Sequence, residues 1–122
     1  MQAGLGIVAV VLSGCCISLG EKVANRIQQY QRELPVGAAY SEVKAYVEKH
    51  GLPYSADSAE RCEENAKMTS PSYRPRGGPC IFALDRVGST WYGFDTAIQL
   101  RLLFDKTGSL AHRDFHQIHT FL

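Results

Sequence analysis

Three histidines near the C-terminus are the residues of this chain that come nearest to a metal site. His112, His116 and His119 lie in the sequence HRDFHQIH. On a helix the three side chains would share one face, as metal ligands do, but on a strand His119 would point away from the other two. A hairpin signal directly before them favours a strand, so we expect histidines at the surface or in pairs and no metal site. A small metal- or ligand-binding enzyme that uses His112, His116 and Asp114 is the alternative.

The sequence contains no recognisable catalytic arrangement. A hydrolase needs a nucleophile, a base and an orienting acid, and although Ser, His and Asp occur, no nucleophile elbow or catalytic signature surrounds them. Gly77-Gly78 follows no predicted strand and leads into Pro79, which argues against a phosphate-binding loop. The 122 residues carry a net charge of only +1, which argues against a nucleic-acid-binding protein. We therefore expect a non-enzymatic protein with no cofactor, no metal and no evident small-molecule substrate.

Near the N-terminus, one cysteine lies in a sequence that resembles the lipobox of bacterial lipoproteins. The first charged residue is Glu21, and an apolar run over residues 5–12 ends in Leu12-Ser13-Gly14-Cys15. An aliphatic residue, two small residues and a cysteine are typical of that motif. The resemblance implies that residues 1–14 are a signal peptide and that Cys15 carries two or more acyl chains, which anchor a protein stably. The alternatives are an uncleaved membrane anchor and a structural segment.

The resemblance to lipoproteins also predicts a location in the bacterial cell envelope. Cys15 is followed by Cys16 and not by Asp, and in proteobacterial lipoproteins an Asp at that position favours retention in the inner membrane. We therefore expect the outer membrane, with the protein facing the periplasm. Residues 15–35 would form a lipid-anchored tether that contains a short helix, and residues 36–122 would form a small α+β domain.

The remaining cysteines, Cys62 and Cys80, lie on either side of a segment rich in proline and glycine, residues 69–79. In an oxidising periplasm the two thiols could form a disulfide bond that closes this loop. The chain-entropy model assigns such a bridge a stabilisation of about 3 kcal/mol. The alternative is two unpaired thiols, one of them buried in a strand.

The first part of the chain is predicted to be helical. Apolar residues at helical spacing predict an amphipathic helix over residues 21–34, which ends before Pro35. A second helix is predicted over residues 41–50, with Ser41 as its N-cap. Residues 56–67 are charged and compatible with a helix, but they carry almost no apolar stripe.

From Cys80 onward the apolar period becomes two, which predicts strands over residues 80–86, 96–104 and 109–121. Between the last two strands, residues 105–108 read as a hairpin loop in which Gly108 is suited to a left-handed conformation. Because Leu110 and Phe115 are out of phase for one face, we expect a bulge in the final strand. Helices followed by antiparallel strands predict an α+β fold, with two helices packed on one face of a three- to four-stranded antiparallel meander.

Two groups of side chains are candidates for binding a protein partner. Gln99 and Arg101 lie on the polar face of the strand at residues 96–104, which is consistent with a sheet that is open to solvent or to a partner on that side. Trp91, Tyr92 and Phe94 form an aromatic cluster. This cluster could be an exposed binding patch, or it could equally pack in the core or at an edge of the sheet.

Several short motifs resemble one family of lipoproteins. They are Val36-Gly37-x-x-Tyr40-Ser41-Glu42-Val43, Gly51-Leu52-Pro53, Trp91-Tyr92 and Leu103-Phe104-Asp105-x-x-Gly108-x-Leu110. This order is similar to the small outer-membrane lipoproteins of the SmpA/OmlA (BamE-like) family and to the related β-lactamase-inhibitor-like fold. The resemblance implies two helices on a three-stranded meander and a protein partner in outer-membrane assembly or maintenance. The alternative is a periplasmic inhibitor or immunity-type protein that blocks a partner enzyme.

Overall fold

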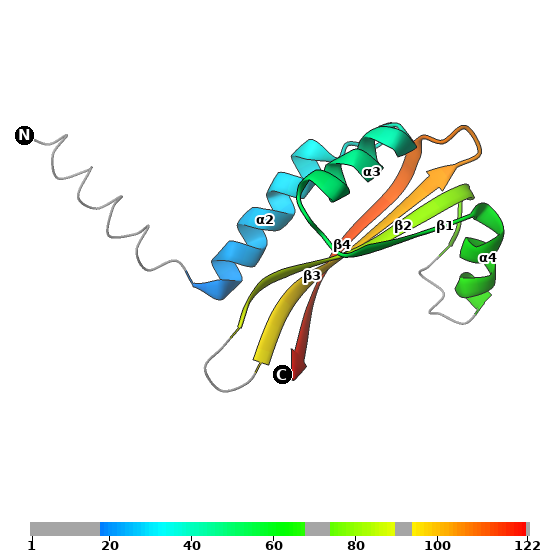
Figure 1. Ribbon diagram of the computed structural model, residues 1–122. Coiled ribbons are helices and arrows are strands. Elements are labelled where there is room, and N and C mark those ends of the chain that lie inside the picture. The colour runs from blue at the N-terminus through cyan, green and yellow to red at the C-terminus, as the bar shows by residue number, and fades with distance from the viewer. Residues whose placement is uncertain (1–17, 68–73, 90–93, 122) are drawn as a thin grey trace, which may run out of the picture.

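The computed structural model describes residues 18–67, 74–89 and 94–121 (Figure 1). This part of the chain forms helices and a four-stranded antiparallel sheet, which confirms the predicted α+β class. Each strand pairs with its neighbours in sequence, in the order β1-β2-β3-β4, so the sheet is a meander. The elements are α2 (Leu19–Glu33), α3 (Tyr40–Lys49), β1 (Tyr54–Asp57), α4 (Ala59–Lys67), β2 (Gly77–Ser89), β3 (Phe94–Asp105) and β4 (Leu110–Phe121).

One face of the sheet forms the main core with α2 and α3, which lie over that face in Figure 1. Because successive strand residues point to opposite faces, every second residue of β3 faces these helices. The residues of β3 on this side are buried throughout, namely Thr96, Ile98, Leu100, Leu102 and Phe104. The helices bury Val23, Tyr30, Leu34, Val43 and Val47 against it. Each large aliphatic side chain that is removed from water in this way stabilises the fold by about 1.5–3 kcal/mol.

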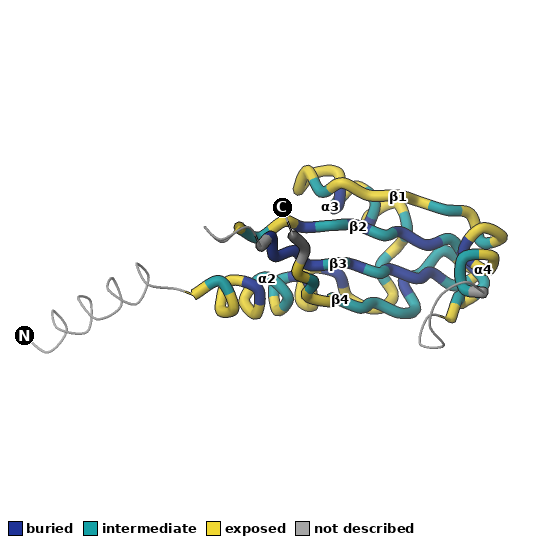
Figure 2. The backbone as a smooth tube through the Cα atoms, turned by 90° about the horizontal axis from the view of Figure 1, so that it is seen from below, coloured by how far each residue is buried: buried dark blue, intermediate teal, exposed yellow. Residues whose placement is uncertain are grey.

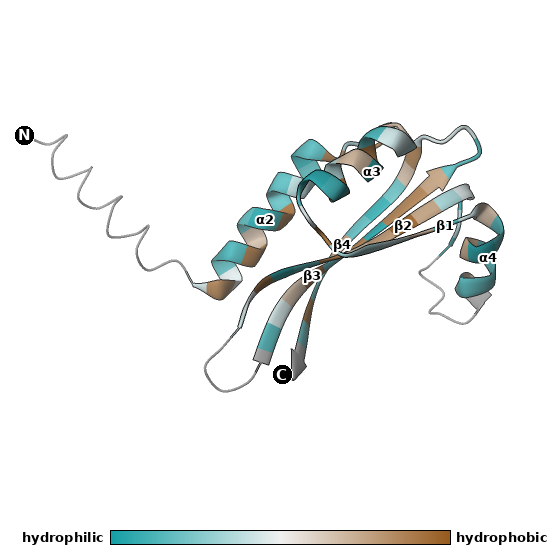
Figure 3. Cartoon of the chain, in the orientation of Figure 1, coloured by the Kyte–Doolittle hydropathy of each residue, from teal (hydrophilic) through white to brown (hydrophobic). Residues whose placement is uncertain are grey.

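Helix α2 is part of this core. Ser18 caps it, because the Ser18 hydroxyl oxygen accepts a hydrogen bond from the Glu21 N–H at 3.1 Å. Most of the helix surface is hydrophilic (Figure 3), while Val23 and Tyr30, two turns apart, are only 2 % exposed. The sequence assigns this helix to the tether that precedes residue 36. In the structure its apolar stripe is buried with the sheet.

Helix α3 begins one residue earlier than its predicted N-cap. Ser41 lies inside the helix, and the N-cap is Ala39, which has no side chain that could accept a hydrogen bond. The start of α3 is instead determined by the backbone of β4 and of the turn before it. The Tyr40 N–H donates to the Gly108 carbonyl at 2.9 Å, and Ala39 pairs with Ser109 in an isolated bridge. A tertiary contact therefore replaces the local cap that the sequence suggests.

The β3–β4 hairpin has the predicted turn and the predicted bulge. Gly108 has a φ of 83°, in the left-handed region. One carboxylate oxygen of Asp105 accepts hydrogen bonds from the Thr107 hydroxyl at 2.6 Å and from the backbone N–H groups of Thr107 and Ser109 at 2.9 and 3.0 Å. These bonds, the Thr107 hydroxyl first, lower the pKa of Asp105 below its usual range.

The bulge in β4 lies directly after this turn. Phe104 pairs with Leu110, whereas Leu103 pairs with His112, so Ala111 is an extra residue in β4. The extra residue shifts the phase of the strand. Leu110 on one side of the bulge and Phe115 on the other therefore both reach the main core.

Helix α4 lies on the opposite face of the sheet, at the end nearest the β3–β4 turn (Figure 2). The predicted disulfide is present and joins Cys62 of α4 to Cys80 of β2, with the two Cα atoms 6.2 Å apart. Both cysteines are buried and pack with Leu103 in a second, smaller core. The bridge thus holds α4 against β2.

The chain between α3 and α4 contains a strand that the sequence does not predict. Residues 56 and 57 lie in the segment that the sequence makes compatible with a helix, but they belong to β1, and α4 begins only at Ala59. β1 pairs with β2 from Tyr54 opposite Ala83 to Asp57 opposite Cys80. Most of its residues are exposed, so it has none of the apolar alternation by which a strand is recognised.

Gly78 of β2 lies directly against the backbone of β3, and we expect its replacement by alanine to destabilise the protein strongly. A Cβ atom at this position would collide with backbone atoms of Phe104 and Asp105. Gly78→Ala should lower the free energy of unfolding by more than about 2 kcal/mol. Gly20→Ala is the matched control, because Gly20 lies in the first turn of α2, where a Cβ atom would lie 3.9 Å from the Ser18 Oγ, an ordinary van der Waals contact. Alanine there should add up to about 1 kcal/mol. Urea denaturation measures both, and equal stabilities would contradict the assigned packing.

Candidate protein-binding face

The face of the sheet opposite α2 and α3 is the candidate binding site, and we call it the open face. The strand register places on it Leu84 and Arg86 of β2, Gln99 and Arg101 of β3, and His112, Asp114, His116 and Ile118 of β4. Among the described residues α4 is the helix that covers part of this side, and it does so at one end (Figure 2). The predicted residues Gln99 and Arg101 therefore lie side by side near the middle of an accessible sheet surface.

The open face has a shallow hollow beside its two central polar residues. The hollow has a volume of about 420 Å³ and is lined by Pro53, Tyr54, Phe82, Leu84 and Gln99 among others. Its walls are mostly apolar, and the Gln99 amide lies at its margin. Such a surface can accept an apolar side chain of a partner while the amide and a neighbouring guanidinium form hydrogen bonds.

Arg101 is positioned by its neighbours on β3 and β4. Its Nη2 lies 3.5 Å from the Gln99 side-chain oxygen, and Asp114 is directly opposite it in the strand register. Opposite charges across a strand pair stabilise the sheet modestly. Arg101 is half-buried, so its aliphatic stem packs on the sheet while the guanidinium can reach a partner.

The three histidines divide between the two faces, as a strand requires. His112 and His116 are on the open face, four residues apart on one strand, which is a separation of about 13 Å and too far to share a metal ion. His119 is on the other face, where its Nδ1 lies 3.1 Å from the Thr96 hydroxyl. In the described ranges no group of three or more His, Cys, Asp or Glu residues is placed to hold a metal ion.

Several residues singled out in the sequence lie outside the described part of the chain. These are Cys15, Trp91 and Tyr92. Of Phe94 only the backbone is described, and it pairs with Phe121 at the far end of the β3–β4 ladder. Leu84 and Ile118, which the sequence did not single out, are half-buried on the open face and add apolar surface to it.

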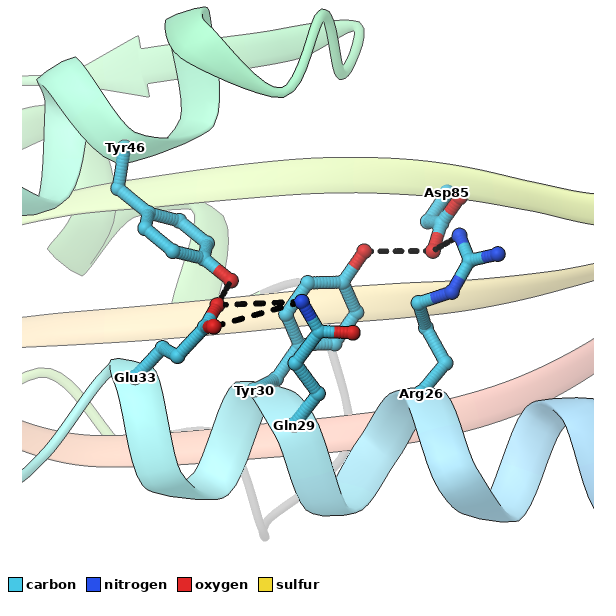
Figure 4. A network of polar contacts seen from close by, with 6 residues as sticks. All are labelled: Arg26, Gln29, Tyr30, Glu33, Tyr46 and Asp85. Carbon is cyan, nitrogen blue, oxygen red and sulfur yellow. Dashed lines mark hydrogen bonds and ion pairs between the residues drawn. The ribbon is translucent and has the colours of Figure 1, made fainter.

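A polar network that the sequence analysis missed lies on the core face (Figure 4). Asp85 of β2 is 5 % exposed. Its carboxylate accepts a hydrogen bond from the Tyr30 hydroxyl at 2.5 Å and forms an ion pair with the Arg26 Nη1 at 2.8 Å. Burial, and then the hydrogen bond to Asp85, raise the pKa of Tyr30 above its usual range. A buried carboxylate is tolerated only when it is paired in this way.

A second group of polar contacts in the same region joins α2 to α3. The Tyr46 hydroxyl of α3 donates to the Glu33 carboxylate, and the Gln29 amide lies 3.3 Å from one of the Glu33 oxygens (Figure 4). Burial, and then the bond to Glu33, raise the pKa of Tyr46 as well. Both tyrosines therefore stay protonated near neutral pH and act as fixed donors. The arrangement joins α2 and α3 to the sheet and contains no activated nucleophile or base.

A signal for this network is present in the sequence. Ile81, Ala83 and Asp85 alternate on one face of β2, so Asp85 is a charge on an apolar row. Arg26 and Tyr30 are four residues apart and share a face of α2. A charge on an apolar strand face, together with a cation and a hydroxyl on one helix face, predicts a buried pair.

No family model, curated protein or solved structure matches this chain. Within the described residues, no helix is long and apolar enough to span a membrane.

The tyrosines of the network make the stability of the protein sensitive to alkaline pH. The folded pKa of Tyr30 lies above its usual value, so its stabilisation is complete below the unfolded pKa of about 10 and is lost as the pH rises toward the folded pKa. Tyr30→Phe should lower stability by about 1–2 kcal/mol at neutral pH and make the alkaline loss shallower. Tyr40→Phe, outside the network, is the control in denaturation at neutral and alkaline pH. An equally steep alkaline loss in Tyr30→Phe would contradict this assignment.

Proposed function

We propose that this chain is a non-enzymatic lipoprotein of the bacterial cell envelope whose small α+β domain binds another protein through the open face. The observation that carries the proposal is the unequal use of the two faces of the sheet. One face is buried under α2 and α3. The other combines half-buried apolar residues, a hollow and hydrogen-bonding side chains on a surface that α4 covers at one end.

The chemistry of the open face is suited to a protein partner. Protein interfaces combine an apolar centre with a polar rim, and arginine is enriched among their most important residues. Leu84 and Ile118 supply apolar area, while Gln99, Arg101 and His116 supply donors and acceptors. A rigid sheet presents these groups with little loss of conformational entropy when a partner binds.

The disulfide supports export to an oxidising compartment. Cys62 and Cys80 are bridged and buried, and structural disulfides persist in secreted and periplasmic proteins but are rare in the cytosol. Together with the lipobox-like Leu12-Ser13-Gly14-Cys15, this favours a periplasmic domain anchored through Cys15. The resemblance to SmpA/OmlA lipoproteins favours the outer membrane, and a partner in its assembly or maintenance.

A crosslinking experiment tests the binding face. A photoreactive amino acid at Gln99 should form a discrete adduct in cells that produce the full chain, whereas the same residue at Lys49, on the exposed end of α3, should not. Arg101→Glu, introduced together with the Gln99 probe, should weaken adduct formation by about 30-fold, because a central interface arginine contributes about 2 kcal/mol or more. Equal adducts from both positions, or no effect of Arg101→Glu in a variant with unchanged melting temperature, would refute the assignment of this face.

Mass spectrometry of the membrane-extracted protein tests the anchor separately. We expect a mature chain that begins at Cys15 and carries the mass of two or more acyl chains. Cys15→Ser should abolish the added mass and release the domain from the membrane fraction. An intact Met1, or a Cys15 without acyl chains, would exclude the lipid anchor while leaving the binding face open to its own test.

A further inference from the structure

The outer edge of β4 is a second surface with a chemistry of its own. β4 runs from Leu110 to Phe121 and is the last strand of the sheet, paired with β3 on one side (Figures 1 and 2). A long edge strand presents backbone N–H and C=O groups that can pair with another strand. The opposite edge strand, β1, contains four residues and offers a much shorter template.

The beginning of β4 is covered on its outer side, and this sets a limit to further pairing. The Gly37 N–H donates to the Leu110 carbonyl, and the Leu110 N–H donates to the Ala38 carbonyl, both at 2.8 Å. Beyond Leu110, no strand of the described ranges pairs with this outer edge. Residues 111–119 are therefore long enough for a further ladder of strand pairs.

We propose that β4 pairs antiparallel with β4 of a second copy of this chain, about a two-fold axis at Phe115. The two four-stranded meanders would then form one continuous sheet. The backbone ladder uses the edge of the sheet, whereas its charged pairs use Asp114 and His116, whose side chains also lie on the open face. The reasons for choosing a second copy as the occupant are the symmetry and the charge pattern of β4.

Symmetry restricts the possible registers. In a continuous sheet with a two-fold axis perpendicular to it, residues that face each other must point to the same side. An axis at Asp114 would place two aspartates opposite each other, and an axis at Arg113 would place two arginines opposite each other. Both registers are unfavourable, because like charges directly opposite each other destabilise a sheet.

An axis at Phe115 avoids these clashes and creates complementary pairs. Asp114 of each copy then faces His116 of the other, twice per dimer, and a carboxylate can accept a hydrogen bond from an imidazole N–H. Asp114 already has Arg101 opposite it on its other side, so the carboxylate lies between two donors. Arg113 would face Gln117, and Ala111 would face His119. The ladder ends at Ala111, because Gly37 and Ala38 already pair with the outer side of Leu110.

Helix α2 leaves room for this arrangement. Its first residue, Leu19, lies against Gly88 of β2, and Arg113 of β4 donates to the carbonyls of Gln31 and Leu34 at its other end. The helix therefore crosses the sheet diagonally, and only its C-terminal end approaches the edge. In the proposed register the two Arg113 residues are separated along the strands by about 13 Å, so the two helix ends do not meet.

Sedimentation equilibrium of the full chain in mild detergent tests the proposal. The wild type should form a dimer within a range from about 1 μM to 1 mM. His116→Asp places aspartates opposite each other twice per dimer and should raise the dissociation constant by about tenfold or more. Exchanging the two residues, Asp114→His with His116→Asp, restores the complementary pairs and should reverse much of that loss. His50→Asp makes the same change at the C-cap of α3 and should leave the dimer unaffected.

Hydrogen exchange of the wild type provides a readout that needs no variant. Amides of residues 111–119 should exchange more slowly as the protein concentration rises through the dissociation constant, whereas amides of β1 should not change. A chain that is monomeric over the whole range overturns the proposal. A dimer that is insensitive to His116→Asp, or that protects β1 instead, also overturns it.

Discussion

The carboxylate of Asp85 lies on a face of the sheet made mostly of apolar side chains, and it needs hydrogen-bond donors there. Arg26 and Tyr30 supply them from one face of α2, and this requirement determines how the helix crosses the strands. Once α2 is placed, Leu34 is buried and Glu33 is within reach of Tyr46, so α3 is placed as well. The apolar contacts of the core contribute most of the stabilising energy, but they are not directional. The charged contact gives the helix layer its specific orientation.

With α2 and α3 packed on one face of the sheet, the opposite face is available for a different role. Here that side is closed at one end by α4, which the Cys62–Cys80 bridge holds in place. The rest of the face keeps a mixture of aliphatic and hydrogen-bonding groups that a water-exposed sheet tolerates and a partner can use. The two faces of the sheet thus differ: one is buried in the main core, and the other is largely available as a surface.

The parts of the fold that could be predicted are those determined by local periodicity and turn chemistry. The alternation of residues 96–104, the turn at Gly108 and the bulge between Leu110 and Phe115 are all of this kind, and the structure confirms them. β1 could not be found in this way, because an exposed four-residue strand depends on its pairing with β2 and carries no pattern of its own. The start of α3 is similarly determined by a distant backbone contact with Gly108. In the candidate site, period-two alternation predicts that Gln99 and Arg101 lie on the same face of the sheet. The hollow beside Gln99 could not be predicted, because residues of β1 form part of its lining.

The order of the strands has a kinetic consequence. The β2–β3 and β3–β4 hairpins each close a short loop at a small cost in entropy, whereas residues 58–76, which contain α4, connect β1 to β2. The contacts of Asp85 with Arg26 and Tyr30, by contrast, join residues 59 and 55 positions apart. A newly made chain can therefore form the hairpins of β2, β3 and β4 while α2 is still undocked, and the apolar face of the sheet is then uncovered. During that interval the uncovered apolar face is prone to aggregation, and the docking of α2 removes it from water.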